Sequence, residues 1–510
     1  MKRRAFTLVE VLISIGIALV LIIAISQIFA IAQQTSGTGT AVLESADTNR
    51  AIQSTLVADM RTMANTASDP LVIVSQPIAA FRSPDDMQQD RDGDPRTFND
   101  TNSSASLSTT DPTAQVWAVN SRIHRVDRLC FCARDIYRRQ TANAPDFTSG
   151  TQSGEAYIWL GHLALPNNTT LGTFDPSNGP QMPAPQGSGF INPGVPSPGN
   201  SNNQFASQWI LGREVILLQA RVPGGPPGIS AAKEMAYGGP SQLSPVALLQ
   251  GNLGSAIVPA GISADGFGVY SSRYDEALTT IQGIDSSIGQ IPLWWAMMSG
   301  LRPLTFFDVR YYANPFPQKP TAAGNPPAQW MSAAVAQTYP IFVRGCTQFI
   351  VEYAGNFVTQ DLNAAPNNNN FGRVISLQPD SITGKIDFIP VKDANGNWTR
   401  RIRWYGYPRD SQGTGTPDVI PLSLFEANNN ATAAQKANWS FERTTTIPSN
   451  KWTPPSSSSS PYHGDPYVCA WGADTIGVPR PKMIRITIAI DDPSGRLNAE
   501  QTYEYVFTLP

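Results

Sequence analysis

The sequence predicts an α+β protein, in which one long N-terminal transmembrane and amphipathic helix packs on a mostly antiparallel β head with long loop insertions. Three observations lead to this prediction. An apolar run occupies residues 6–32, an apolar stripe with helical spacing follows it, and short alternating segments recur in the rest of the chain. The 510 residues suit one large folded unit or two smaller ones.

The apolar run at residues 6–32 is long enough to form a membrane helix, which needs about 20 apolar residues. Lys2, Arg3 and Arg4 precede it, as in a secretory signal peptide. However, the run exceeds the roughly 7–15 residues of a signal core, and no small-x-small cleavage site closes it. We therefore expect a retained helix, with residues 1–5 in the cytoplasm and the chain after about residue 34 outside.

Glu10 is the single charge within this apolar run. A carboxylate inside a membrane segment costs a few kcal/mol and needs a partner, unless it lies at the depth of the lipid headgroups and is merely tolerated. Cleavage between Ala5 and Phe6 would create a suitable cation, the new amino terminus at Phe6. The amine of one subunit would then pair with Glu10 of a neighbour, and this pairing would set the register between two helices.

The residues AFTLVEVLI, at positions 5–13, resemble the prepilin motif of type IV pilins and type II secretion pseudopilins. The resemblance implies that a membrane prepilin peptidase removes leader residues 1–5. It also implies that Phe6 becomes N-methylated and that Glu10 guides the subunit into a filament. The family usually has glycine before the cut, whereas this chain has Ala5, which keeps the small size. The resemblance covers only about the first 30 residues.

The function implied by this resemblance is that of a membrane-anchored minor pilin or pseudopilin that primes or tips a type IV pilus or a type II secretion pseudopilus. Its partners would be other pilins, through the N-terminal helix, the prepilin peptidase and the bacterial inner membrane. The head would lie in the periplasm or on a surface filament, and its bulk favours the tip over a repeated shaft. Two alternatives stay open: a tip adhesin using loop aromatics such as Trp294, Trp295 or Trp330, and a membrane-tethered enzyme.

The helix is expected to continue beyond the membrane, so that it covers residues 6–66. Its apolar stripe has spacings of four, four and three residues, and consists of Ile52, Leu56, Met60 and Met63. The charged residues Asp47, Arg50, Asp59 and Arg61 fall largely off this stripe. Between the two parts, Gly37 and Gly39 stand among threonines, which weakens a helix and predicts a kink or a melted turn there.

Alternating patterns predict the strands of the head. Residues 483–490 alternate isoleucine with other residues, a turn sequence follows, and residues 502–507 alternate again, which predicts a C-terminal strand pair. Further strands are expected at 156–165, 213–220 and 347–353. Residues 387–391 and 400–405 are expected to form a hairpin around an Asn-Gly turn. The final third of the chain is weakly similar in style to J-type and W-type minor pilins.

Low-complexity stretches suggest that long loops interrupt the head, which spans residues 67–510. Residues 85–112 are polar and acidic, and residues 165–203 are rich in proline, glycine and asparagine. A division of the head near 166–205 and one elaborated sheet with long loops are equal alternatives. Charged residues make up only 15% of the chain, and the basic clusters at 122–128 and 400–403 are interpreted as outer faces of strands. We therefore expect no nucleic-acid partner.

The sequence predicts no catalytic residue, no cofactor and no metal site. The three histidines, His124, His162 and His463, match no known catalytic or metal-binding spacing. Residues Asp90–Asp94 resemble part of a calcium loop, but Pro95 stands where the loop needs glycine, so a solvated acidic loop is favoured and calcium stays open.

The chain has four cysteines, Cys130, Cys132, Cys346 and Cys469. An even number outside the cytoplasm permits disulfides. Cys130 and Cys132 would share one face of a strand, so they are not expected to bridge each other. Two long-range disulfides and four free buried thiols remain equal alternatives.

Overall fold

A computed structural model gives the fold of the chain. It describes residues 8–66, 69–75, 77–89, 123–138, 152–162, 205–218, 276–277, 281, 341–362, 371–376, 378–392, 396, 398–409, 418–422, 442–443, 467–472, 478–492, 496–497 and 500–510. The loop segments at 165–203, the expected division near 166–205, the loop Asp90–Asp94 and the tryptophans at 294, 295 and 330 lie almost wholly or wholly outside these ranges. Within them the chain is α+β, as predicted.

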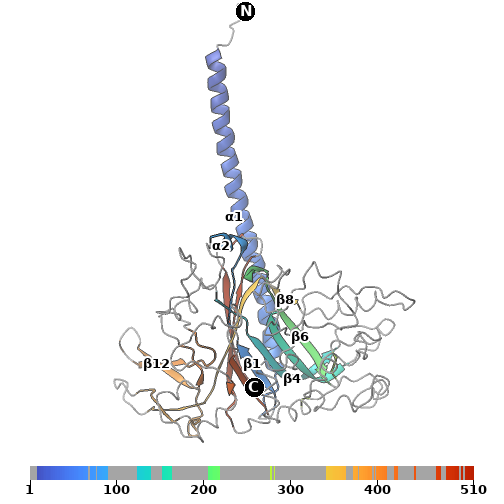
Figure 1. Cartoon of the computed structure of the whole chain (residues 1–510), viewed down its shortest axis with the longest axis vertical. Coiled ribbons are helices and arrows are strands. Elements are labelled where there is room, and N and C mark those ends of the chain that lie inside the picture. Colours follow the sequence, from blue (N-terminus) through green and yellow to red (C-terminus); the bar gives the residue numbers. More distant parts are fainter. Residues whose placement is uncertain are drawn as a thin grey trace, which may run out of the picture.

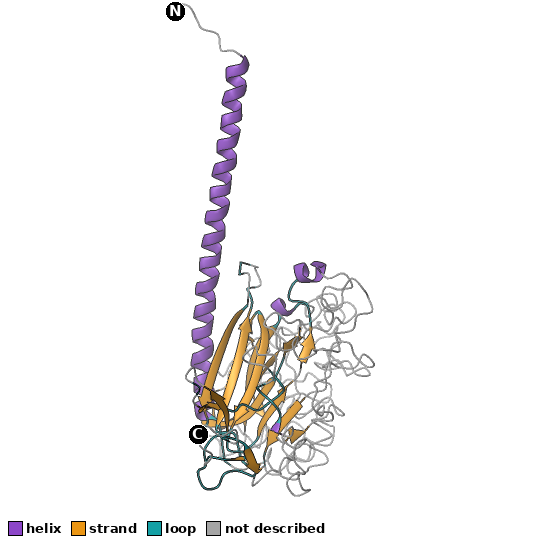
Figure 2. Cartoon of the chain, turned by 90° about the vertical axis from the view of Figure 1, so that its left-hand side faces the viewer, coloured by secondary structure: helices purple, strands orange, loops and turns teal. Residues whose placement is uncertain are grey.

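Helix α1 (Leu8–Thr62) is one continuous helix of 55 residues. Its first half projects away from the head, and its second half lies along the strands at one side of the head (Figures 1 and 2). The predicted kink near Gly37 and Gly39 is therefore wrong.

Contacts with the head account for the unbroken helix. The hydroxyls of Thr35, Thr38 and Thr40 each lie within hydrogen-bond distance of the carbonyl four residues earlier, at 2.8, 3.0 and 3.0 Å, a pattern that by itself slightly weakens a helix. The head supports the segment, because the Thr38 hydroxyl also reaches the carbonyl oxygen of Arg496 at 3.3 Å and Ala41 is buried. Tertiary contacts thus outweigh a low intrinsic helix propensity.

Within the described ranges, the larger sheet contains eight strands. Its order is β14 (Glu442–Arg443), β15 (Tyr467–Trp471), β1 (Leu71–Ser75), β4 (Arg128–Arg138), β5 (Gln152–His162), β6 (Ile210–Leu218) and β7 (Glu276–Ala277), and β8 (Ile341–Arg344) also pairs with β6. All pairings are antiparallel except that of β6 with β7. Chain segments from both ends of the head therefore meet in one sheet.

A second sheet has the order β17 (Gln501–Thr508), β16 (Met483–Ile490) and β9 (Cys346–Ala354). β16 pairs with β17 in the register Ile484 opposite Phe507, which confirms the predicted C-terminal strand pair. The predicted hairpin is also confirmed: β12 (Phe388–Lys392) pairs with β13 (Trp398–Ile402), and Gly396 has a φ of 80° in the connecting turn.

Four short strands and two short helices complete the described head. β2 (Pro77–Ala79) pairs with β3 (Ile123–Arg125), and β10 (Thr359–Gln360) pairs with β11 (Val374–Ser376). Residues Pro84–Gln89 form the short helix α2, at the start of a segment that the sequence assigned to a loop. Residues Ala206–Gln208 form a single 3₁₀ turn, η2.

The hydrophobic core lies where the second half of α1 meets both sheets. The predicted stripe of Ile52, Leu56, Met60 and Met63 is buried there, beside side chains of the larger sheet such as Phe131 and of the smaller sheet such as Ile486. Each fully buried aliphatic side chain stabilises the fold by about 1.5–3 kcal/mol. The stripe therefore attaches the helix firmly to the head.

Buried ion pairs correct part of the prediction for the basic clusters. Arg125 and Arg128 are buried rather than on an outer strand face, and Arg125 donates to the fully buried Asp127 at 2.6 and 2.9 Å. Asp127 also accepts the backbone N–H of Val351 at 2.8 Å, so this pair joins the two sheets. The Asp127 carboxylate offsets part of the free-energy cost of burying the Arg125 guanidinium. Arg400, by contrast, is exposed as predicted.

All four cysteines are buried and free. Of the two alternatives that the sequence left open, the structure supports free buried thiols. Burial raises the pKa of the Cys130 thiol to about 12, so it stays protonated and unreactive near neutral pH.

Candidate assembly site on the N-terminal helix

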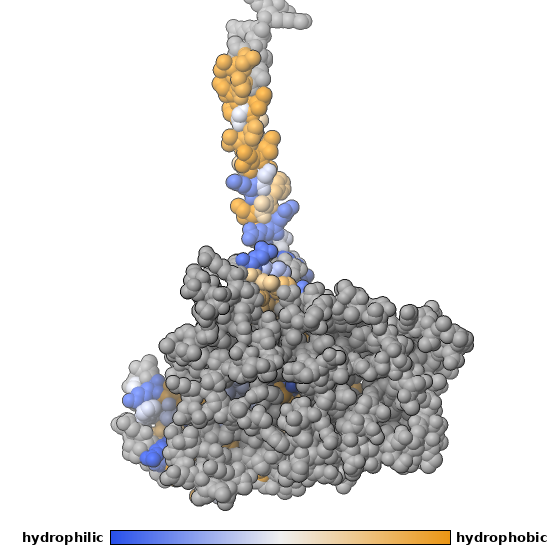
Figure 3. Space-filling view, in the orientation of Figure 1, coloured by the Kyte–Doolittle hydropathy of each residue, from blue (hydrophilic) through white to orange (hydrophobic). Residues whose placement is uncertain are grey.

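The first half of α1 is an exposed apolar surface. Leu8, Val20 and Phe29 are 77%, 67% and 63% exposed, and no residue of the most apolar stretch is buried against the head. Figure 3 shows this half in hydrophobic colours, which give way to polar ones just before the head. An exposed apolar surface of this length marks a contact with lipid or with other proteins. In the described part of the chain, α1 is the one helix long and apolar enough to cross a membrane.

Of the three sequence-predicted site residues, the structure describes the backbone of Glu10 alone. Glu10 belongs to the first turns of α1, which begins at Leu8. Ala5 and Phe6 precede the described residues. The backbone therefore places Glu10 at the end of α1 that is farthest from the head, where the head makes no contact with the helix (Figure 1).

Polar contacts fix the second half of α1 to the head along its length. Near the point where the helix meets the head, Glu44 pairs with Arg496 at 2.6 Å, and the Ser45 hydroxyl lies 2.7 Å from the hydroxyl of Tyr503. At the far end, the hydroxyl of Tyr137 donates to Thr62 at 2.8 Å. Contacts at both ends hold the helix in one rotation about its axis relative to the head.

The strongest polar contact of the helix is the ion pair between Asp59 and Arg213 of β6. The guanidinium donates two hydrogen bonds to the carboxylate, at 2.6 and 2.7 Å, and Asp59 is only 3% exposed. The sequence analysis missed this contact because it treated Asp59 as lying largely off the stripe. The signal was present, since Asp59 follows Leu56 by three residues and precedes Met63 by four, which puts it on the same helix face.

Two of the three histidines meet in the core, but not in a polar cleft. The rings of His124 and His162 both contact Trp209 edge-on, with centroid distances of 5.4 and 5.7 Å. Burial lowers the pKa of each to about 4, so both are neutral at pH 7. His463 lies outside the described residues. The histidine pair therefore acts as packing and offers no support for the enzyme alternative.

Comparison with known proteins adds one finding. The family described as "Prokaryotic N-terminal methylation motif" matches residues 1–26. No curated protein and no solved structure matches the chain. The matched segment contains Ala5, Phe6 and Glu10 and runs into the exposed half of α1. The motif supports a type IV pilin-like or pseudopilin precursor, a class of structural proteins, and together with the apolar helix it is consistent with membrane anchoring.

Proposed function

We propose that the chain is a minor pilin or pseudopilin, a structural subunit that primes or tips a type IV pilus or a type II secretion pseudopilus. One observation carries the proposal: the methylation motif leads directly into a helix whose first half is apolar and makes no contact with its own head. A surface of this kind suits lipid before assembly and the helices of other pilins afterwards.

In the proposed mechanism, a prepilin peptidase cuts between Ala5 and Phe6 and the new amine at Phe6 is N-methylated. The Glu10 carboxylate of one subunit then pairs with the Phe6 amine of a neighbour. An unpaired carboxylate inside a membrane segment costs free energy, so the pairing favours one register between adjacent helices. The unbroken α1 transmits that register to the head, because the head is fixed to its second half.

The proposed position is the tip or the priming complex. The head spans residues 67–510, so each subunit would carry a large head on a single helix. Heads of this size would crowd one another if they were repeated along a shaft. The head would lie in the periplasm or at the cell surface, and the anchor in the inner membrane until assembly. The proposed partners are other pilins, the prepilin peptidase and the membrane.

N-terminal mass spectrometry of the chain purified from its native membrane tests the processing step. We expect a mature chain that begins with N-methylated Phe6. A chain that still begins with Met1 would show that the helix is only an anchor, and a cut after the apolar run would show an ordinary secreted protein. Either result would refute the proposal.

A substitution tests the assembly step. Glu10→Val should leave membrane insertion and cleavage intact but abolish incorporation into filaments, measured in sheared filament fractions. Ser14→Val is the matched control, since it removes a polar group one turn further along the same apolar segment. Normal incorporation of the Glu10 variant would refute the pairing mechanism.

A further inference from the structure

A cavity of about 150 Å³ lies beside the β12–β13 hairpin, on a different part of the head from α1. The side chains of Val358, Leu362, Ile386 and Ile402 line it together with the ring of Phe388. Ligand sites for larger molecules occupy roughly 300–1,000 Å³. This cavity therefore suits a group of about the size of one large side chain.

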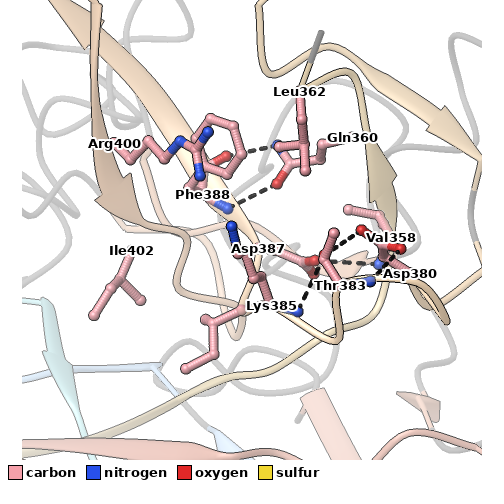
Figure 4. A pocket seen from close by; sticks show the side chains of 11 residues that line it. Val358, Gln360, Leu362, Asp380, Thr383, Lys385, Asp387, Phe388, Arg400 and Ile402 are labelled. Carbon is pink, nitrogen blue, oxygen red and sulfur yellow. Dashed lines mark hydrogen bonds between the residues drawn. The ribbon is translucent and has the colours of Figure 1, made fainter.

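The wall of the cavity is held in place before any ligand arrives. The side-chain amide of Gln360 donates to the carbonyl oxygen of Phe388 at 2.8 Å, and the Phe388 N–H donates back to the Gln360 carbonyl at 2.8 Å (Figure 4). The same amide also donates to the carbonyl of Gly372 at 2.9 Å. A preformed wall lowers the ordering cost of binding.

The two carboxylates at the cavity already have partners within the protein. Asp380 accepts the backbone N–H groups of Ile382 and Thr383 at 2.9 and 3.1 Å, and also the Thr383 hydroxyl. Asp387 is buried and accepts the hydroxyl of Tyr405 at 2.7 Å. Both carboxylates therefore use acceptor oxygens in hydrogen bonds within the protein.

The two cations at the cavity, Arg400 and Lys385, form no ion pair within the part of the chain that the structure describes. Arg400 stacks over the rings of Phe388 and Phe371, 4.9 and 5.5 Å from their centroids, and Figure 4 shows it beside Phe388 at one side of the cavity. A ring face attracts a guanidinium but accepts few of its five N–H donors. Among the described residues, no carboxylate forms an ion pair with Arg400 or Lys385, whereas the adjacent Arg401 pairs with Asp418 at 3.3 Å.

We propose that this cavity binds a carboxylate attached to a small apolar group. The apolar part would occupy the space beside Phe388 and Ile402, and the carboxylate would meet Arg400 and Lys385. The guanidinium supplies paired donors that match the two oxygens of a carboxylate. Such a group has two sources, a free small carboxylic acid or the C-terminal carboxylate of a polypeptide that ends in an apolar residue.

Isothermal titration calorimetry on the full chain in nonionic detergent tests the proposal. The probes are benzoate and its neutral analogue benzamide, and a second pair is N-acetyl-Gly-Phe with a free or an amidated C-terminus. We expect a carboxylate to bind weakly, with a Kd of about 1 mM, because solvent-exposed cations such as Arg400 and Lys385 contribute little to affinity. The neutral analogues should bind at least tenfold more weakly.

Variants identify the residues responsible. Arg400→Gln and Lys385→Gln should each weaken carboxylate binding about two- to fivefold. Lys392→Gln is the control, because Lys392 belongs to the same hairpin but packs over Trp398 and does not line the cavity. Binding of benzoate but not the dipeptide would identify a small acid as the source, and preference for the dipeptide would identify a chain terminus; both support the proposal.

Three outcomes would overturn this assignment: no binding of either carboxylate, equal binding of the neutral analogues, or unchanged affinity in both cavity variants. None of them bears on filament assembly, because the cavity lies in the head and the measurement does not depend on cleavage at Phe6.

Discussion

The two halves of α1 belong to one unbroken helix but face different surroundings. Leu19 in the first half is 55% exposed, whereas Leu56 in the second half is fully buried against both sheets. The second half obtains its partners from its own chain, and the first half must obtain them from lipid or from other chains. This difference separates residues that stabilise the head from residues that are available for a membrane and, in the proposed function, for assembly.

The largest expected effect comes from the ion pair that fixes the packed half. Asp59→Ala leaves the Arg213 guanidinium without its carboxylate and should lower the free energy of unfolding by about 3–5 kcal/mol. Asp47→Ala is the control on the same helix, since its pair with Arg50 is exposed and should contribute no more than about 0.5 kcal/mol. Urea unfolding followed by tryptophan fluorescence measures both. Equal effects would show that the packed half is not held as the structure indicates.

A matched leucine pair tests the comparison directly. Leu56→Ala opens a cavity in the core and should cost about 2–5 kcal/mol. Leu19→Ala makes the same chemical change in the projecting half, where no part of the head packs, and should leave the urea midpoint unchanged. A shift of the midpoint by the Leu19 variant would indicate that the first half also contributes to the folding of the head.

Acid should destabilise the fold of the head without changing the attachment of α1 to membranes. Burial alone would raise the pKa of Glu352, but Arg409 and Arg485, at 2.8 and 2.5 Å, outweigh it and lower the pKa to about 2. Because the folded pKa lies below the unfolded value, this group stabilises the fold above about pH 4.5. That contribution, about 3 kcal/mol, is lost as the pH falls toward 2.

Glu352→Gln provides the test of this linkage. The variant should be less stable at pH 7 and should show a flatter decline of stability between pH 4.5 and 2, measured by urea unfolding. Co-sedimentation with membranes should stay unchanged for both proteins over this range, because the projecting half of α1 has no contact with the head. A slope identical to that of the parent chain would show that Glu352 is not the group that titrates.

The sequence predicted the features that depend on neighbouring residues. The stripe from Ile52 to Met63, the strands β16 and β17 and the β12–β13 hairpin all follow local periodicity or turn chemistry, and all are confirmed. What the sequence did not predict depends on residues far apart in the chain. Asp59 meets Arg213, Arg125 is buried beside a residue that also binds β9, and β1 pairs with β15 across almost 400 residues.

The candidate assembly site and the cavity differ in the same respect, since one rests on neighbouring residues and the other on separate segments. The motif around Glu10 is local and lies within residues 1–26, which the methylation-motif family matches, and the role of Glu10 stays a prediction. The cavity at Arg400 instead arises from β12, β13 and the segments 358–362 and 380–387. No spacing in the sequence brings Lys385 and Arg400 to one cavity, because the hairpin that joins them has to form first.

The smallest expected effect concerns the boundary between the two halves. A Cβ added at Gly39 would meet no atom within 4 Å, and Gly39 is exposed in a continuous helix. Gly39→Ala should therefore stabilise this segment by about 0.5–1 kcal/mol and slow amide hydrogen exchange there about two- to fivefold. Met60→Leu, a volume-conserving change far from this boundary, should leave exchange at the segment unchanged. Unaltered exchange in the Gly39 variant would mean that the segment is already open in solution, and the kink that the sequence predicted would separate the two halves after all.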